Sequence, residues 1–303
     1  MDTPAVNRSG GGEAATPDGG DSVPPHPPRY SELTKRIASA AVLGPGVIYV
    51  VHLGGWALTA FVMLAAVLMT YEWARLVRGS HLNADYVIHA ITAIIAVGLA
   101  GLGLPLFALG AAAVGFIIAM GVVIWRSEGK RWPMIGFPYI LLPCIAIVWL
   151  RSDGEWGMWT LYWLLAVVWA TDIMAFVVGR TIGGPKLAPR FSPAKTWSGL
   201  LGGMAGAAVA GALTSVFLGL DAFWLLAAIS GATAIIAQVG DIAESALKRY
   251  ANVKDSSALI PGHGGVLDRV DGLIFAAVAA AFVALIGVLA EEGEGIGLGI
   301  FVV

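Results

Sequence analysis

The sequence lacks the features of a disulfide-stabilised or highly charged soluble protein. Its 303 residues include one cysteine, Cys144, which excludes an internal disulfide and a cysteine-based metal site. Only 13% of the residues are charged, whereas about a quarter are charged in typical soluble domains. Because hydrophobic residues make up 58% of the chain, the composition places the protein in the membrane class. Cys144 is expected to be a small core residue.

Long apolar runs are abundant in this sequence. About 20 apolar residues in a helix cross the roughly 30 Å hydrocarbon core of a bilayer. Runs near that length predict an all-α, polytopic integral membrane protein with about nine transmembrane helices, at 36–53, 55–76, 86–102, 104–124, 134–150, 157–179, 198–219, 222–240 and 272–290. The third and fourth runs are the least clearly separated, because only Gly101 to Pro105 lies between them.

The first 30 residues differ from the rest in composition. They are rich in Gly, Pro, Ser, Thr and Asp, and too poor in large apolar side chains to offset the entropy of ordering. We expect residues 1–30 to be a disordered cytoplasmic tail, and not a signal peptide, since no short hydrophobic core with a cleavage site precedes the first run. N-terminal transmembrane helices are then expected over 31–150, a C-terminal transmembrane catalytic region over 151–290, and a short tail over 291–303.

The positions of the cations predict the orientation of the helices. With nine spans, seventeen of the eighteen lysines and arginines fall on one side of the membrane, and only Arg151 falls on the other. Because cytoplasmic loops carry the excess of Lys and Arg, the amino terminus and the even-numbered connections are predicted to be cytoplasmic.

Two connections, 179–198 and 241–271, are longer and more polar than the others. The helix of the eighth run is predicted to continue past Asp241, which places Asp241, Ser245 and Lys248 at i, i+4 and i+7 on one face. A carboxylate, a hydroxyl and an ammonium together suit Mg²⁺ and a phosphate chain. The alternative is a polar helix end in which Ser245 and Lys248 interact locally.

A glycine-rich turn follows at 261–265. Its glycines allow the backbone to approach a ligand closely, and the amides of Gly264 and Gly265 are candidates for cradling a phosphate. A plain loop is the alternative. His263 is a candidate base, metal ligand or phosphate donor, or else it holds the turn.

Two carboxylates come directly after this turn. Asp268 and Asp271 are spaced i, i+3 around Arg269, where the ninth run begins. If Asp268 faces Asp241, the pair can hold one or two divalent cations for a phosphoryl displacement. Asp271 alternatively caps the following helix near its amino terminus.

The earlier connection also carries candidate groups. Asp172 lies inside the sixth apolar run, where an ionisable residue is costly and is a functional candidate by default. We expect it to face a cytoplasmic cavity and to pair with Arg180 or Lys195, with a purely structural ion pair as the alternative. Ser192, Lys195 and Thr196 offer two hydroxyls and an ammonium for a phosphate, and three prolines within 185–193 predict fixed turns instead of a helix.

The segment from Ser245 to Asp271 resembles the signature of the phosphatidate cytidylyltransferase family. Its pattern is Ser-x-x-Lys-Arg-x₄-Lys-Asp-x₅-Pro-Gly-His-Gly-Gly-x₂-Asp-Arg-x-Asp. The stretches 240–245, 192–196 and 172–183 are also similar to the family, so the close matches cover roughly the carboxyl-terminal half. Tyr-Glu-Trp at 71–73 is a fainter match.

The resemblance implies a polytopic membrane enzyme that joins CTP to phosphatidic acid and releases CDP-diacylglycerol and pyrophosphate. The candidate catalytic residues are Asp241, Ser245, Lys248 and Asp268. The candidate metal ligands, with Mg²⁺ as the cofactor, are Asp241, Asp268 and Asp271. The candidate substrate-binding residues are Asp172, Arg180, Ser192, Lys195, Thr196, Arg249, Lys254, His263, Gly264, Gly265 and Arg269. We expect the cell inner membrane as the location, with the site facing the cytoplasm, membrane lipids as partners and no nucleic acid.

Two positions depart from the family pattern. The family usually has Tyr where Phe176 stands and Glu where Ser198 stands, so neither position is counted as a site residue. The alternatives are a cytidylyltransferase for another lipid phosphate, an inactive homologue, and a transporter or channel in which Asp172 and Asp241 line a path. The sequence leaves open the acyl-chain preference, the number of metal ions, any monovalent-ion requirement and the oligomeric state, a homodimer included.

Overall fold

The structure is a computed structural model, and it describes residues 29–79, 84–126, 132–260 and 264–290. Nine α-helices follow one another in this part of the chain: α1 Arg29–Leu53, α2 Gly55–Arg78, α3 Ala84–Gly101, α4 Pro105–Trp125, α5 Leu142–Arg151, α6 Gly154–Thr181, α7 Trp197–Leu218, α8 Phe223–Tyr250 and α9 Leu267–Ala290. Two short strands, β1 Lys186–Ala188 and β2 Ser192–Thr196, form an antiparallel hairpin between α6 and α7. The predicted all-α class is therefore correct apart from this hairpin.

Seven of the described helices are long and apolar enough to cross a membrane: α2, α3, α4, α6, α7, α8 and, within α9, Leu267–Gly287. The chain is thus a multi-pass membrane protein, but the predicted count of nine spans is not confirmed. The apolar parts of the other two helices are the shorter segments Ala41–Leu53 and Phe137–Arg151.

The predicted fifth run, 134–150, is not one regular helix. It begins in a 3₁₀ turn, Trp132–Ile135, continues as a π turn, Phe137–Leu141, and becomes α-helical only in α5. Pro133, Pro138 and Pro143 recur through this stretch, and each lacks the amide hydrogen that a helix interior needs. Apolar composition alone did not reveal this interruption.

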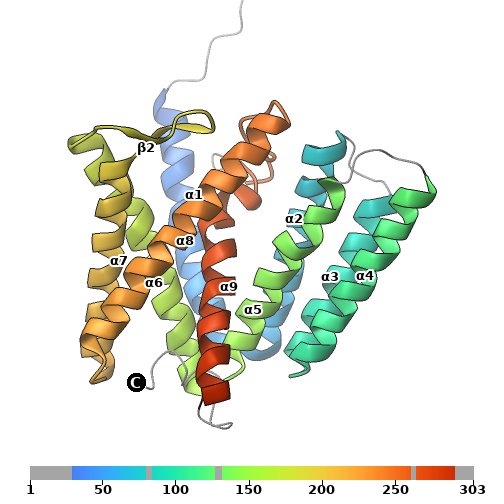
Figure 1. The fold of residues 1–303 in the computed structure, drawn as a ribbon, viewed down its shortest axis with the longest axis horizontal. Helices are drawn as coiled ribbons and strands as arrows, with labels where there is room; N and C mark the ends of the chain where they lie inside the picture. Colours follow the sequence, from blue (N-terminus) through green and yellow to red (C-terminus); the bar gives the residue numbers. More distant parts are fainter. Residues whose placement is uncertain (1–28, 80–83, 127–131, 261–263, 291–303) are drawn as a thin grey trace, which may run out of the picture.

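The polar connections gather at one end of the bundle. In Figure 1, α2, α6 and α8 end there, α7 and α9 begin there, and the hairpin lies across the same end. At the other end, Arg151 donates hydrogen bonds to the carbonyl oxygens of Val51 at 2.8 Å and Gly154 at 2.7 Å. The one cation that was predicted on the opposite side therefore ties the end of α1 to the start of α6.

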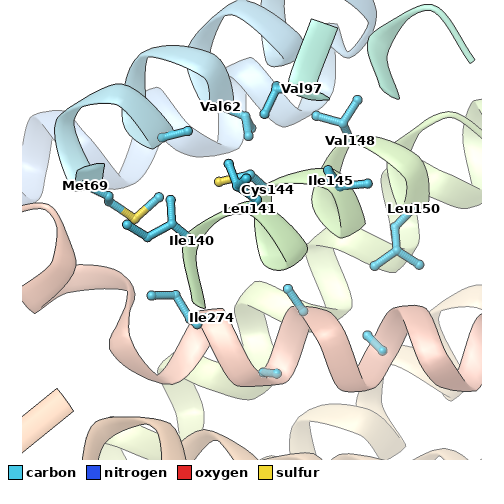
Figure 2. Close-up of a cluster of buried hydrophobic side chains, with 14 of the residues drawn as sticks. Val62, Met69, Val97, Ile140, Leu141, Cys144, Ile145, Val148, Leu150 and Ile274 are labelled. Carbon is cyan, nitrogen blue, oxygen red and sulfur yellow. The ribbon is translucent and has the colours of Figure 1, made fainter. Parts of the chain in front are cut away.

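A cluster of buried hydrophobic side chains lies between α2, α3, α5 and α9. Figure 2 shows Val62 and Met69 of α2 facing Leu141 and Cys144 at the start of α5, with Ile274 of α9 on the far side. The single cysteine is buried there, as the sequence predicted.

Small residues let the helices around the polar end approach closely. A Cβ added to Gly206 of α7 would lie 2.5 Å from the Met174 side chain of α6. A Cβ added to Gly240 of α8 would lie 2.6 Å from the carbonyl oxygen of Asp271 in α9. The second contact holds the turn that carries Asp241 directly against α9.

Candidate active site

A cavity of about 660 Å³ opens between α6, α7, α8, α9 and the hairpin. It brings together nine of the predicted site residues, which come from both polar connections: Asp172, Arg180, Lys195, Thr196, Asp241, Lys248, Asp268, Arg269 and Asp271. A concave site with converging charged groups is the usual form of a binding site. Residues of both polar connections therefore line one cavity.

Three carboxylates face one another across this cavity. Asp241 of α8 is close enough to interact electrostatically with Asp172 of α6 and with Asp271 of α9. Lys195 forms an ion pair with Asp241 and donates to the side-chain oxygen of Gln238 at 3.2 Å. The sequence predicted a different pair, because it assigned Lys195 or Arg180 to Asp172.

The hairpin explains why Lys195 reaches Asp241. Lys186 pairs with Thr196 across its two strands, so the polypeptide folds back and β2 presents Lys195 to the cavity. Thr196 then begins α7 as its N-cap, since its hydroxyl accepts a hydrogen bond from the amide of Gly199 at 3.1 Å. Thr196 was predicted to bind a phosphate, and the structure gives its hydroxyl this capping role.

Lys248 and Asp268 form a second ion pair, at 2.8 Å, between α8 and α9. The other oxygen of Asp268 accepts hydrogen bonds from the amides of Ser256 at 2.9 Å and Gly265 at 2.8 Å. Lys248 also contacts Glu244 at 2.8 Å, and the Glu244 side chain is fully buried. Both oxygens of Asp268 are therefore already occupied by protein donors.

The oxygen donors of the cavity match the preference of Mg²⁺. Asp172, Asp241 and Asp271 line it together, and Mg²⁺ usually takes one or two carboxylates plus water and substrate phosphates. In the described ranges, no group of three or more His, Cys, Asp or Glu side chains forms a ready-made metal cage. The residues fit a cation shared with a substrate, and Asp241 with Asp172 or Asp271 fits better than the predicted pair of Asp241 and Asp268.

Several predicted site residues do not line the cavity. Ser192 pairs with Ala188 inside the hairpin, and Arg249 donates to the carbonyl oxygen of Phe191 at 3.5 Å. Ser245 and Lys254 are also absent from the cavity wall, while His263 lies outside the described residues.

The glycine amides have protein acceptors in place of the predicted phosphate. The amide of Gly264 donates to the carbonyl oxygen of Ile260 at 3.1 Å, and that of Gly265 donates to Asp268. Gly264 has a φ of +83°, which favours glycine at this turn. Because α9 already begins at Leu267, Asp271 lies within the helix and not at its cap. Its side chain lines the cavity.

The chain is similar to known proteins over most of its length. A family model for cytidylyltransferases matches residues 34–286. The chain belongs to the cytidylyltransferase family. A phosphatidate cytidylyltransferase of Brucella abortus is 39% identical over 269 residues, which cover 87% of this chain and 96% of the relative. One of Pseudomonas aeruginosa is 34% identical over 258 residues, 80% of this chain and 93% of the relative.

Membership of the cytidylyltransferase family makes this chain a nucleotidyltransferase, so the transporter alternative is no longer needed.

The two departures from the family pattern have different surroundings. Phe176 lines the cavity, and the guanidinium of Arg180 lies 5.8 Å from the centre of its ring. Ser198 donates to the carbonyl oxygen of Gly183 and so closes the connection that carries the hairpin.

One buried carboxylate of this cytidylyltransferase was missed as a site residue. Glu72 of α2 accepts hydrogen bonds from the segment that leads into α9, including the amide of Leu267 at 2.8 Å. The available signals were a glutamate within an apolar run and the faint resemblance at 71–73. Neither signal said which segment Glu72 would contact.

Proposed function

We propose that this chain is a phosphatidate cytidylyltransferase, which joins CTP to phosphatidate and releases CDP-diacylglycerol and pyrophosphate. The observation that carries the proposal is a single cavity, at one end of a membrane bundle, that presents both carboxylates and cations. The relatives that bear this name match nearly their whole length, which supports the same substrates here.

A second hollow supports a lipid as the acceptor. It has a volume of about 410 Å³, lies between the hairpin, α7 and α8, and is mostly apolar. Leu200 and Gln238 line both this hollow and the polar cavity, so the two lie side by side. A lipid whose chains lie against the apolar side would bring its phosphate towards Lys195.

In the proposed reaction, a phosphate oxygen of phosphatidate forms a bond to the α-phosphorus of CTP while the bond to pyrophosphate breaks. Arg180, Lys195 and Arg269 would bind the phosphates and orient them for in-line displacement. Asp241, with Asp172 or Asp271, would hold Mg²⁺, which supplies charge neutralisation to the triphosphate when bound. No strong base is required, because a phosphomonoester is largely ionised at neutral pH.

We place the protein in the cell inner membrane, with the cavity open to the cytoplasm. The two polar connections, which hold eight of the eighteen Lys and Arg residues, share the cavity's end of the bundle, and such loops are usually cytoplasmic. CTP is made in the cytoplasm, so this orientation also brings the nucleotide to the site. A mass measurement in detergent would test whether the protein forms a homodimer.

The test is an assay of the purified protein with CTP, Mg²⁺ and phosphatidate. Asp241→Ala should lower CDP-diacylglycerol synthesis by about 10²-fold or more, because it removes a cation ligand and the partner of Lys195. Asp221→Asn is a control, since this exposed carboxylate lies in the turn between α7 and α8. Full activity of Asp241→Ala, or turnover only with a non-glycerol lipid phosphate, would overturn the proposal.

A further inference from the structure

Glu72 and Glu244 are the most deeply buried carboxylates in the part of the chain that the structure describes, and both have an exposed fraction of 0%. One oxygen of Glu72 accepts from the hydroxyl of Ser257 at 2.6 Å and the amide of Val266 at 2.8 Å. The other accepts from the amide of Leu267 at 2.8 Å and faces the hydroxyl of Ser256 at 3.2 Å. Three donors, together with a hydroxyl that is shared with Asp268, offset the loss of hydration of this buried carboxylate.

These groups come from the connection between α8 and α9 and from the first residue of α9, almost 200 residues further along the chain. Two are amides at the start of α9, where the first turn of a helix has no internal acceptors. A carboxylate there also interacts favourably with the helix dipole. Glu72 therefore fixes where α9 begins, and Asp268 is the second residue of that helix.

Ser256 joins Glu72 to Asp268. Its hydroxyl lies 3.2 Å from Glu72 and 2.9 Å from the Asp268 oxygen that also accepts the Ser256 amide. Gly265 closes the junction, because a Cβ there would lie 2.6 Å from Glu72 and would collide with the Ser256 hydroxyl. Only glycine therefore fits at position 265, beside this junction.

We propose that Glu72 is a positioning residue for nucleotidyl transfer, which acts through Ser256 and the start of α9 to hold Asp268, and with it Lys248, at the cavity wall. Glu72 does not line the cavity, so it has no direct contact with substrate to offer. The kinetic part of the test rests on the proposed function, whereas the structural part does not.

The structural test uses a nitroxide label on Leu259→Cys. Leu259 is 43% exposed and lies in the connection, while the native Cys144 is buried and would not react. In the full-length protein, Glu72→Gln should increase the mobility of this label. The substitution replaces one carboxylate oxygen, which can accept two hydrogen bonds, with an NH₂ group that can only donate. Thr70→Val, a buried change on the same helix that removes a hydroxyl donating to the carbonyl oxygen of Ala66, should leave the mobility unchanged. Unchanged mobility in Glu72→Gln would overturn the proposal.

The kinetic test compares Glu72→Gln, Ser256→Ala and the double variant. Displacing Asp268 by about 1 Å should lower kcat by about 10²-fold with a smaller change in KM for CTP. Ser256→Ala should cost less in the Glu72→Gln background than in the wild type, because both act on Asp268. If the fold-losses of the two single variants simply multiply in the double variant, Glu72 does not act on Asp268 through Ser256. If Glu72→Gln fails to fold, Glu72→Asp keeps the charge but shortens the reach to the amides of Val266 and Leu267, and it should still loosen the label.

The two proposals fail in distinguishable ways. A wild-type protein that makes no CDP-diacylglycerol would overturn the proposed function and leave the label experiment valid. A fully active wild type whose label ignores Glu72→Gln would overturn the role of Glu72 alone.

Discussion

At the scale of single residues, the charges of the cavity fall into two kinds. Asp268 and Asp241 each have a lysine partner, whereas Asp172 and Asp271 have no ion pair within the described part of the chain. Both oxygens of Asp268 are bound by Lys248 and by backbone amides, whereas a single lysine contacts Asp241. A cation held by Asp241 would therefore take the place of Lys195, and Asp172 or Asp271 could share it from either side.

Lys248 offers a direct test of the internal pairs. It bridges Glu244 and Asp268, whose side chains are 0% and 3% exposed. Lys248→Met should lower the free energy of unfolding by about 3 to 5 kcal/mol, because it leaves two buried carboxylates without their cation. Thermal unfolding in detergent measures this loss, and adding Glu244→Gln should recover part of it. Equal stability of Lys248→Met and the wild type would contradict the ion-pair assignment.

At the scale of elements, close packing of α8 against α9 sets the distance between Asp241 and Asp271. Gly240→Ala should push the two helices apart, since the new Cβ would meet the backbone oxygen of Asp271 at 2.6 Å. Overpacking of this kind costs about 1 to 3 kcal/mol. Gly231→Ala on the same helix is the matched control, because its nearest neighbour would be 3.7 Å away.

The measurements are thermal unfolding and synthesis of CDP-diacylglycerol. Gly240→Ala should lose both stability and activity, while Gly231→Ala should keep both or gain slightly from its higher helix propensity. If the two variants behave alike, the contact between α8 and α9 does not control the site.

The sequence predicted these elements unevenly, for physical reasons. Apolar runs near membrane length located most helices, and the continuation of α8 beyond Asp241 was correct because the helical pattern persists there. The hairpin at 186–196 was missed, since its strands are short and its prolines indicated only turns. Contacts such as Glu72 with Leu267 leave no local periodicity, so no single-sequence pattern identifies them.

At the scale of the whole molecule, the protein has two unlike ends. The cavity, the hairpin and the connection between α8 and α9 lie at one end, whereas the turn between α7 and α8 lies at the other (Figure 1). A lipid phosphate and a soluble nucleotide can meet only if the first end faces the compartment that contains CTP. Sidedness is therefore a property on which the proposed function depends.

Cysteine labelling in sealed membrane vesicles tests this sidedness. The native Cys144 is buried, so Val253→Cys near the cavity end and Asp221→Cys at the other end each introduce one accessible thiol. In right-side-out vesicles, a membrane-impermeant maleimide should label Asp221→Cys at once and Val253→Cys only after permeabilisation. Inverted vesicles should give the opposite order and serve as the control. Labelling of Val253→Cys from outside would place the cavity away from cytoplasmic CTP, and the proposed reaction could not proceed in that orientation.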